Sequence, residues 1–421
     1  MNWIDRYQIT VYPGRTHDEK VLHSPLARRQ TVVKTAWLDA VKDLAEPPAE
    51  MRGLTDYIPF AERPHVAAPD DYTLLTVLPN NRCNFACSYC YSAGSRNTAE
   101  IEPDVLRTAI DYFIDTKRTR PSRRKLTVSF MGGGEPMLSW DTIRDGIIYA
   151  IGKAEKEGVD VAFRIVTNGS ILTDEQIDFI LYHHIGLSIS FEVLPEVQNL
   201  QRKNFDTVQA NLRRALAAGI DTQLNVTVTK HNVRRMAETY DTMRHLYPVV
   251  KNAMFEPVTA QDLFDSPADM EDFYNAYLEG FMEIYRRGRA DGVEITSFPY
   301  LRTVYPLRRA CPGEFCVTAE GFLTGCYCVA TADHPLFNRT HYGNVHRDLV
   351  TLDMETYRDL IKCNVDTNPE CAACSARWNC GGGCFHLFNS YDLEYRDAVC
   401  RFTRRFVEAM TTYRAYYEDQ N

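Results

Sequence analysis

The hydrophobic positions of residues 72–290 alternate between two patterns, one typical of buried strands and one typical of amphipathic helices. Strands that alternate with helices favour parallel βαβ units, because a parallel connection needs a crossover. Periodicity alone allows either an incomplete barrel or an open doubly wound sheet. The expected strands cover residues 73–78, 126–131, 162–167, 187–191, 223–229 and 253–258. The expected helices cover residues 103–116, 140–156, 174–182, 204–218, 231–246 and 269–290.

The two ends of the chain differ from residues 72–290 in hydrophobic periodicity and in composition. Residues 7–12 alternate like a short strand, residues 30–44 read as a strand running into a helix, and a proline-rich stretch follows. From about residue 305 cysteine, glycine and proline are dense and periodicity fades, so we expect metal clusters rather than apolar side chains to form the core there. Residues 402–418 look helical again. The pattern predicts domains at 1–70, 71–300 and 301–421.

The cysteines change this picture most. The chain has 421 residues and 13 cysteines, three between residues 83 and 90 and the others between 311 and 400. Such clusters are either a disulfide framework or metal ligands. The N-terminus shows no signal-peptide pattern, and no apolar run approaches the ~18 residues of a membrane span. We therefore expect a cytoplasmic metalloprotein. The net charge of -9 favours neither nucleic acid nor an anionic membrane as partner.

The first cysteine group follows the first expected strand with the spacing Cys83-x3-Cys87-x2-Cys90. Loops that leave the carboxyl ends of parallel strands carry the chemistry in barrel enzymes. Iron–sulfur cubanes usually take four thiolates, so three thiolates leave one iron open. The alternatives are a zinc site completed by a distant histidine, or buried thiols. Zinc sites more often use paired C-x2-C knuckles.

This triad, with Tyr89 just before the third cysteine, resembles the radical S-adenosylmethionine (SAM) superfamily. The resemblance implies an enzyme with a partial (β/α)6 TIM-like barrel. It also implies that SAM binds the open iron through its amino and carboxylate groups. One electron then cleaves the sulfonium to methionine and a 5′-deoxyadenosyl radical, which abstracts hydrogen from a substrate.

Other strand ends fit the same family. Residues 133–136 resemble its Gly-Gly-Glu-Pro element, residues 167–169 its Thr-Asn-Gly turn, and Ser190 its strand-end serine. Glu192 and Val193 depart from the Asp-Gly that relatives have. Taken one by one, the glycine-rich element would be a tight turn, Ser190 an ordinary strand-end serine and Arg202, 12 residues further on, a solvated arginine. Their order and spacing together favour a cofactor pocket. The resemblance implies SAM contacts from Tyr89, Gly133, Gly134, Glu135, Asn168, Ser190 and Arg202.

The C-terminal cysteines resemble the SPASM domain of radical enzymes that modify peptides and proteins, an auxiliary-cluster domain. The resemblance rests on the spacing Cys371-x2-Cys374-x5-Cys380-x3-Cys384, followed by Cys400. A zinc ribbon is the alternative. The resemblance implies three [4Fe–4S] clusters in all. Cys371, Cys374, Cys380 and Cys400 would hold auxiliary cluster II, and Cys311, Cys326 and Cys384 auxiliary cluster I, whose fourth ligand stays open among Cys316, Cys328 and Cys363.

Relatives with this organisation include anaerobic sulfatase maturases and maturases of ribosomally made peptides. The former have an aspartate directly after the cysteine that matches Cys326, where this chain has Tyr327. We therefore predict a peptide maturase that forms an oxidative carbon–carbon, ether or thioether cross-link. A sulfatase-type Cys or Ser oxidase and a zinc-ribbon binding protein are the alternatives. No catalytic base is assigned; Tyr327 and His386 are candidates.

The expected partners are a precursor peptide or protein and an electron donor such as flavodoxin or ferredoxin, acting on a monomer. Residues 1–70 either hold a leader peptide by strand addition or cap the barrel.

Overall fold

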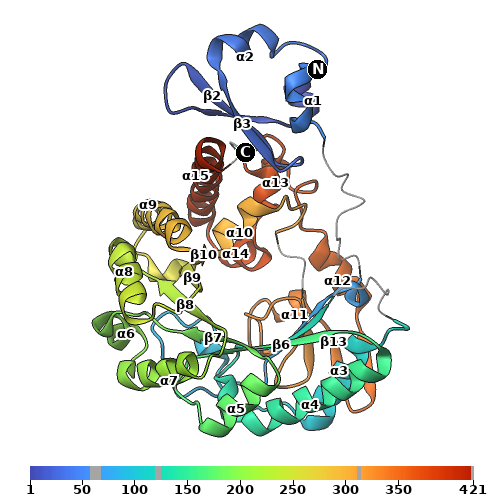
Figure 1. Ribbon diagram of the computed structural model, residues 1–421. Coiled ribbons are helices and arrows are strands. Elements are labelled where there is room, and N and C mark those ends of the chain that lie inside the picture. The colour runs from blue at the N-terminus through green and yellow to red at the C-terminus, as the bar shows by residue number, and fades with distance from the viewer. Residues whose placement is uncertain (57–67, 119–124, 311–313, 419–421) are drawn as a thin grey trace.

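The computed structural model describes residues 1–56, 68–118, 125–310 and 314–418. A sheet of eleven strands, in the order β10-β9-β8-β7-β6-β5-β4-β11-β12-β13-β14, forms its centre (Figure 1). Strands β4 to β10 run parallel, and β4 and β10 are not neighbours, so the barrel stays open. The partial barrel is therefore confirmed. Its strands are β4 (Leu74–Val77), β5 (Leu126–Phe130), β6 (Val161–Thr167), β7 (Gly186–Ser190), β8 (Thr222–Val228), β9 (Asn252–Pro257) and β10 (Glu294–Thr296).

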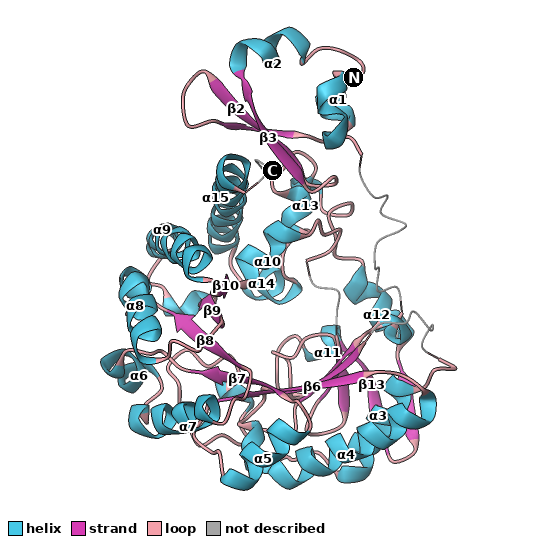
Figure 2. Cartoon of the chain, in the orientation of Figure 1, coloured by secondary structure: helices cyan, strands magenta, loops and turns pink. Residues whose placement is uncertain are grey.

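The expected helices lie on the outer face of this sheet (Figure 2). The helix expected at residues 231–246 begins late, at Met236, because the 3-10 turn Val233–Arg235 comes first. One short helix, α6 (Pro195–Gln201), was not predicted. The others are α3 (Pro103–Ile114), α4 (Trp140–Glu157), α5 (Asp174–Tyr182), α7 (Phe205–Ala217), α8 (Met236–Leu246) and α9 (Pro267–Asp291).

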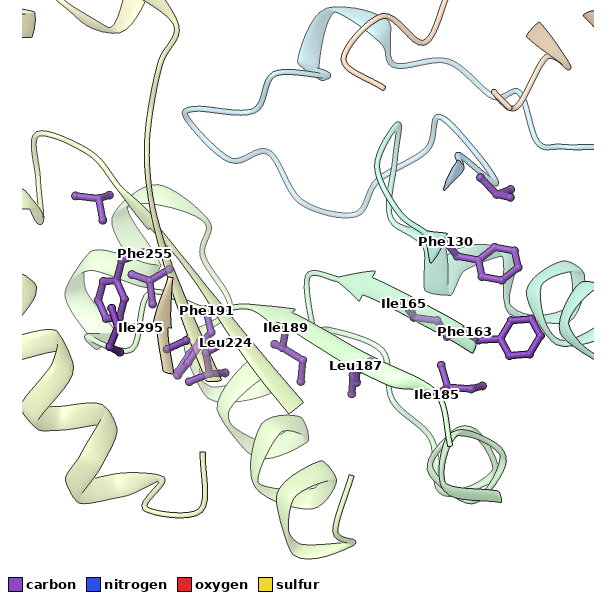
Figure 3. Packing of buried hydrophobic residues seen from close by; sticks show 14 of the residues in the cluster. Phe130, Phe163, Ile165, Ile185, Leu187, Ile189, Phe191, Leu224, Phe255 and Ile295 are labelled. Atoms are coloured by element: carbon purple, nitrogen blue, oxygen red, sulfur yellow. The ribbon is translucent and has the colours of Figure 1, made fainter. Parts of the chain in front are cut away.

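The face of the sheet that the helices cover is packed by side chains from successive strands (Figure 3). Phe130, Ile165 and Ile189 are fully buried, and so are Leu224 and Phe255 further along the sheet. Inward and outward residues alternate along each strand, which is the period-two pattern that made these strands predictable.

The expectation that clusters replace an apolar core after residue 305 was wrong. Phe315, Tyr342 and Phe406 are buried in the same core as the barrel. The strands here are too short for a readable periodicity, and β11 pairs parallel with β4 to extend the sheet. They are β11 (Phe315–Val317), β12 (Phe322–Thr324), β13 (His341–His346) and β14 (Leu349–Leu352). The helices are α10 (Phe298–Val304), α11 (Phe337–Thr340), α12 (Met354–Ile361), α13 (Arg377–Cys380), α14 (Phe385–Ser390) and α15 (Leu393–Tyr417).

Residues 1–54 form a small separate layer with its own core around Trp3, Leu22 and Leu38. Its three-stranded antiparallel sheet has the order β1-β2-β3 and packs on α15 (Figure 1). Trp378 Nε1 in α13 also donates to Gln8 Oε1 at 2.6 Å. The elements are α1 (Trp3–Arg6), β1 (Thr10–Pro13), β2 (Glu19–Ser24), β3 (Arg29–Lys34) and α2 (Thr35–Val41).

The proline-rich stretch lies partly in residues 57–67, outside the described residues. In the described part of the chain, no helix combines the length and the apolar character that crossing a membrane requires.

Phe281 tests the packing that joins the barrel to the C-terminal region. This residue of α9 is fully buried, with its ring 5.2 Å from that of Phe406 in α15 and 6.0 Å from that of Tyr300 in α10. Phe281→Ala should lower the free energy of unfolding by about 3–5 kcal/mol, because it leaves a cavity. Anaerobic chemical denaturation measures the loss. Phe298→Ala, at a ring 48% exposed, is the control and should change little; equal losses would contradict this packing role.

Candidate functional site

The loop after β4 brings the three predicted cluster cysteines together. Cys83, Cys87 and Cys90 are all half-buried free thiols, and Cys90 N donates to the carbonyl of Cys87 at 3.2 Å. Burial raises the pKa of Cys87; Arg202 acts in the opposite direction, and Cys90 adds to the rise. A metal overrides such a rise, because a coordinating thiol loses its proton outright.

Two of these sulfurs receive polar contacts. Phe85 N donates to Cys83 Sγ at 3.4 Å, and Asn168 Nδ2 lies 3.9 Å from the same sulfur. Arg96 Nη2 donates to Cys90 Sγ at 3.2 Å. Hydrogen bonds to cluster sulfurs are one of the means by which proteins adjust the potential of an iron–sulfur centre. The donors around this loop therefore fit a cluster that carries negative charge.

The glycine-rich loop after β5 lies directly against the cysteine loop. Gly134 N donates to the carbonyl of Asn80 at 2.8 Å, and Glu135 N donates to that of Arg82 at 2.7 Å. A Cβ on Gly134 would stand 1.8 Å from the Arg82 oxygen, and one on Gly133 2.7 Å from the Asn80 oxygen. Glycine is required here because two loops meet, not only because a ligand approaches.

The carboxylate of Glu135 ties β5 to the predicted Thr-Asn-Gly turn. It accepts hydrogen bonds from Thr167 Oγ at 2.5 Å, Asn168 N at 2.7 Å and Met137 N at 3.0 Å. Burial raises the pKa of Glu135, and these donors act in the opposite direction. Asn168 Nδ2 in turn donates to Asn84 Oδ1 at 2.9 Å, inside the cysteine loop. Glu135 and Asn168 thus hold the loops together; their direct contacts with SAM stay a prediction.

A buried triad of Tyr89, Glu192 and Arg202 stands behind the cysteine loop. Arg202 Nη1 donates to Tyr89 Oη at 2.7 Å and lies 3.9 Å from Glu192 Oε1, which also accepts a hydrogen bond from the tyrosine. Thr227 N donates to Glu192 Oε2 at 2.9 Å. Burial raises the pKa of Glu192 to about 7, against the opposing effect of Arg202.

The two departures from the family pattern have physical explanations. Glu192 takes part in the triad above, a role the sequence signalled only by an acidic residue two positions after Ser190. Val193 is fully buried and has φ of 67°, a left-handed conformation that is costly for a β-branched side chain and natural for glycine. The backbone therefore keeps the glycine conformation where the side chain differs.

Arg202 keeps one donor free for a ligand. Its Nε is buried and has no hydrogen-bond partner among the described residues. An unpartnered buried guanidinium nitrogen is costly unless an acceptor arrives, and a carboxylate is a strong acceptor for it. This geometry fits the predicted contact with the SAM carboxylate. Ser190 lies nearby at the end of β7, opposite Asn225 of β8.

Four C-terminal cysteines line one cavity of about 350 Å³. They are Cys371, Cys374, Cys380 and Cys400, the set predicted for auxiliary cluster II. Burial raises the pKa of Cys371 to about 11, and the neighbouring thiols Cys380 and Cys374 add to the rise. Burial likewise raises the pKa of Cys400 to about 12. Arginines 377, 401 and 404 also line the cavity, so the donor set and the charge fit an anionic cluster.

A second group of cysteines gathers near β12. The Cys328 thiol raises the pKa of its hydrogen-bonded neighbour Cys326, and burial adds to the rise. Cys326 in turn lies close enough to Cys384 to raise the pKa of that thiol. Burial raises the pKa of Cys363, and the nearby thiol of Cys384 adds to the rise. Cys316 is fully buried in β11 among apolar side chains. Cys311, a predicted ligand, lies outside the described residues.

These positions leave the fourth ligand of auxiliary cluster I open. Across the described ranges, no three His, Cys, Asp or Glu side chains lie close enough together to hold a single metal ion.

Glu314 is a residue that the sequence did not single out. Its Oε2 is buried and has no hydrogen-bond partner among the described residues. Burial raises the pKa of Glu314 to about 8. Its carboxylate lies close enough to Tyr327 and Tyr91 to raise the pKa of both, and the two tyrosine rings meet edge to face at 5.7 Å. The carboxylate can therefore accept a hydrogen bond from a bound molecule. The other candidate, His386, packs against His334 at 5.5 Å.

Glu256 tests the electrostatics of the barrel mouth. It lies on β9 and accepts a hydrogen bond from Phe298 N at 2.8 Å. Burial raises its pKa to about 8, against the opposing effects of that N–H and of Arg302. A raised pKa contributes stability below the unfolded value near 4.5 and loses it as pH rises through about 8. The Tm of the wild type should therefore fall relative to that of Glu256→Gln between pH 5 and 8.

Differential scanning fluorimetry under anaerobic conditions measures this trend. The exposed Glu102→Gln serves as the control and should follow the wild type at every pH. A constant Tm difference between wild type and Glu256→Gln would contradict the raised pKa.

Comparisons with known proteins agree with this geometry. Residues 77–243 match the family model of the radical SAM superfamily. The serine-type anaerobic sulfatase-maturating enzyme of Klebsiella aerogenes is 23% identical over 354 residues, which cover 78% of this chain and 82% of the relative. The cysteine-type anaerobic sulfatase-maturating enzyme of Clostridium novyi is 20% identical over 328 residues, 72% of this chain and 85% of the relative.

Solved structures show the same fold. The anSMEcpe structure with bound AdoMet and the Kp18Cys peptide has a TM-score of 0.65 at 16% identity, covering 81% of this chain and 98% of that one. Streptococcus suis SuiB bound to its precursor peptide SuiA has a TM-score of 0.55 at 16% identity, covering 78% and 76%. With the cysteine loop after β4 inside the matched range, residues 77–243 of this chain are a radical SAM domain, which a cysteine-rich C-terminal region follows.

Proposed function

We propose that this enzyme is a peptide maturase that abstracts hydrogen from a residue of a ribosomally made precursor and closes an oxidative cross-link. The observation that carries the proposal is the thiol-lined cavity formed by Cys371, Cys374, Cys380 and Cys400, a set of cysteines separate from those of the barrel loop. An oxidation needs an electron acceptor besides the radical source, and a second cluster site can provide one. Relatives with a similar fold are named with peptide substrates.

The residues of the barrel would hold the radical source. Cys83, Cys87 and Cys90 hold a four-iron cluster, and with SAM bound this group supplies the 5′-deoxyadenosyl radical. Arg202 offers its free Nε to the SAM carboxylate, and Tyr89 keeps the guanidinium in place through the 2.7 Å hydrogen bond. Glu192 balances the arginine charge, so the pocket can bind a zwitterion without an excess of positive charge.

The C-terminal residues would hold two auxiliary clusters. Cys371, Cys374, Cys380 and Cys400 hold one, and Cys311, Cys326 and Cys384 hold the other with a fourth ligand among Cys316, Cys328 and Cys363. Bound clusters supply electron acceptors for the substrate radical, with potentials adjusted by the surrounding charges. The three arginines around the first set would then favour acceptance of an electron.

The remaining partners follow from the same chemistry. An external one-electron donor such as flavodoxin or ferredoxin would reduce the barrel cluster of a monomeric, cytoplasmic enzyme. A leader peptide could add as a further strand to an edge of the three-stranded sheet of residues 10–34, since extended peptides pair with such edges.

A second candidate is a sulfatase-type maturase that oxidises a Cys or Ser side chain. The similarity to two sulfatase-maturating enzymes favours it. Tyr327 weighs against it, because relatives of that type carry an aspartate there.

Cluster content separates the radical enzyme from a zinc-ribbon protein. Anaerobically reconstituted protein should contain about 12 irons and about 12 sulfides per chain, the content of three four-iron clusters. The triple variant Cys83→Ala, Cys87→Ala, Cys90→Ala should keep about two thirds of this iron and form no 5′-deoxyadenosine from SAM. Elemental analysis and chromatography of the products measure both; zinc without sulfide, or 5′-deoxyadenosine from the triple variant, would contradict the assignment.

Product analysis separates the two candidate reactions. Incubation with SAM, a reductant and Cys- or Ser-containing sulfatase peptides should leave those peptides unchanged. A short precursor peptide found by searching the reading frames beside the gene should lose two hydrogens per cross-link, with the linked residues identified by tandem mass spectrometry. Formylglycine in the sulfatase peptides, trapped as a hydrazone, would instead establish the second candidate.

A further inference from the structure

One cation of the barrel lies in direct contact with a cluster cysteine. Arg96 Nη2 donates to Cys90 Sγ at 3.2 Å, and Ser92 Oγ lies 3.3 Å from the same sulfur. The sulfur of Cys83 meets only neutral donors, Phe85 N and Asn168 Nδ2. A guanidinium stays charged across the whole working pH range of proteins. Arg202 acts on Cys87 electrostatically, but the hydrogen bonds to the triad are asymmetric, because the cationic one goes to Cys90.

The fold holds Arg96 in this place through its neighbour Asn97. Asn97 Oδ1 accepts hydrogen bonds from Asn81 Nδ2 at 3.1 Å and from Ala99 N at 2.9 Å. Asn97 Nδ2 donates to Glu320 Oε1 at 3.0 Å, which reaches the C-terminal region. These hydrogen bonds hold the segment after the triad against the cysteine loop and against the C-terminal region. The backbone position of Arg96 is therefore fixed, with its side chain directed at Cys90.

The charge of Arg96 has no counterion in the described residues. Among the described residues Arg96 forms no ion pair with an Asp or Glu, and its Nε is buried without a hydrogen-bond partner. Burial lowers its pKa, and only Glu135 acts in the opposite direction. By contrast, Arg202 lies 3.9 Å from Glu192. A half-buried cation without a counterion is costly, unless the group at Cys90 is itself anionic.

We propose that Arg96 raises the reduction potential of the cluster held by Cys83, Cys87 and Cys90, an inference that rests on the proposed function. Reduction of a four-iron cluster takes one electron from an external donor, and no bond forms or breaks. That electron adds one negative charge beside the guanidinium. A cation at hydrogen-bonding distance stabilises the more negative state, so the electron arrives more readily with Arg96 present than without it.

The reduction potential tests this directly. Wild-type holoenzyme, Arg96→Gln and Arg96→Lys are titrated anaerobically with dithionite while EPR follows the signal that changes shape on addition of SAM. At the wild-type midpoint, Arg96→Gln should show a tenfold lower ratio of reduced to oxidised cluster, a downward shift of about 59 mV for one electron. Arg96→Lys keeps a cation and should shift less.

A surface arginine provides the matched control. Arg107 on α3 is 49% exposed and pairs with Asp104 at 3.3 Å, so Arg107→Gln makes the same change in net charge away from the triad. It should leave the midpoint unchanged. A wild-type midpoint in Arg96→Gln with full iron content would overturn the inference and leave the proposed function intact. If Arg96→Gln loses its iron, Arg96→Met serves as the neutral variant, and a wild-type midpoint in it with full iron content overturns the inference instead.

The proposed function fails in a different way. A wild-type protein without any reducible, SAM-responsive cluster would contradict the proposed function itself, whatever the Arg96 variants show.

Discussion

The close contact between two loops at the carboxyl edge of the sheet is the constraint on which the site depends. The glycine-rich loop after β5 touches the cysteine loop after β4 with no room for a Cβ at Gly134. Glu135, held inside that contact, reaches on to Thr167 and Asn168 after β6. Three consecutive strand ends are thereby fixed relative to one another, and the three thiols keep their spacing before any cluster binds. A preformed set of ligands of this kind reduces the ordering cost of binding.

Electrostatics follows from the same placement. Acids and arginines are placed together around the cysteine loop: Glu135, Glu192 and Arg202 are buried there, and Arg96 is half-buried. Each carboxylate accepts several backbone or hydroxyl hydrogen bonds, which limits the cost of burying it. The arginines are left with unpartnered Nε donors. The pocket therefore offers free hydrogen-bond donors, which a site for a carboxylate and an anionic cluster needs.

Much of the barrel could be predicted from the sequence, because long parallel strands and amphipathic helices have strong periodicities. Strand β6 was expected at 162–167 and runs Val161–Thr167. The C-terminal region could not be predicted in this way. Strands β11 and β12 are only three residues long, too short to show a period, and the pairing of β11 with β4 is a long-range contact. The juxtaposition of four cysteines in one cavity was implied by the resemblance of their pattern to the SPASM domain.

The side-chain partners were less predictable than the positions. Motif spacing marked Arg202, but nothing local indicated that Glu192 and Tyr89 would hold it. Glu314 and Arg96 carry no motif at all, since each becomes significant only when the chain folds back on the cysteines. Buried polar groups of this type are recognised by their surroundings, which a sequence pattern does not contain.

The central claim is that SAM binds directly to the iron that Cys83, Cys87 and Cys90 leave open. Electron–nuclear double resonance of the reduced enzyme with SAM labelled at its amino nitrogen and carboxylate oxygen tests it most directly. The account predicts strong magnetic couplings to both labels, as expected for atoms bonded to a cluster iron. A reduced cluster without coupling to either label would contradict it.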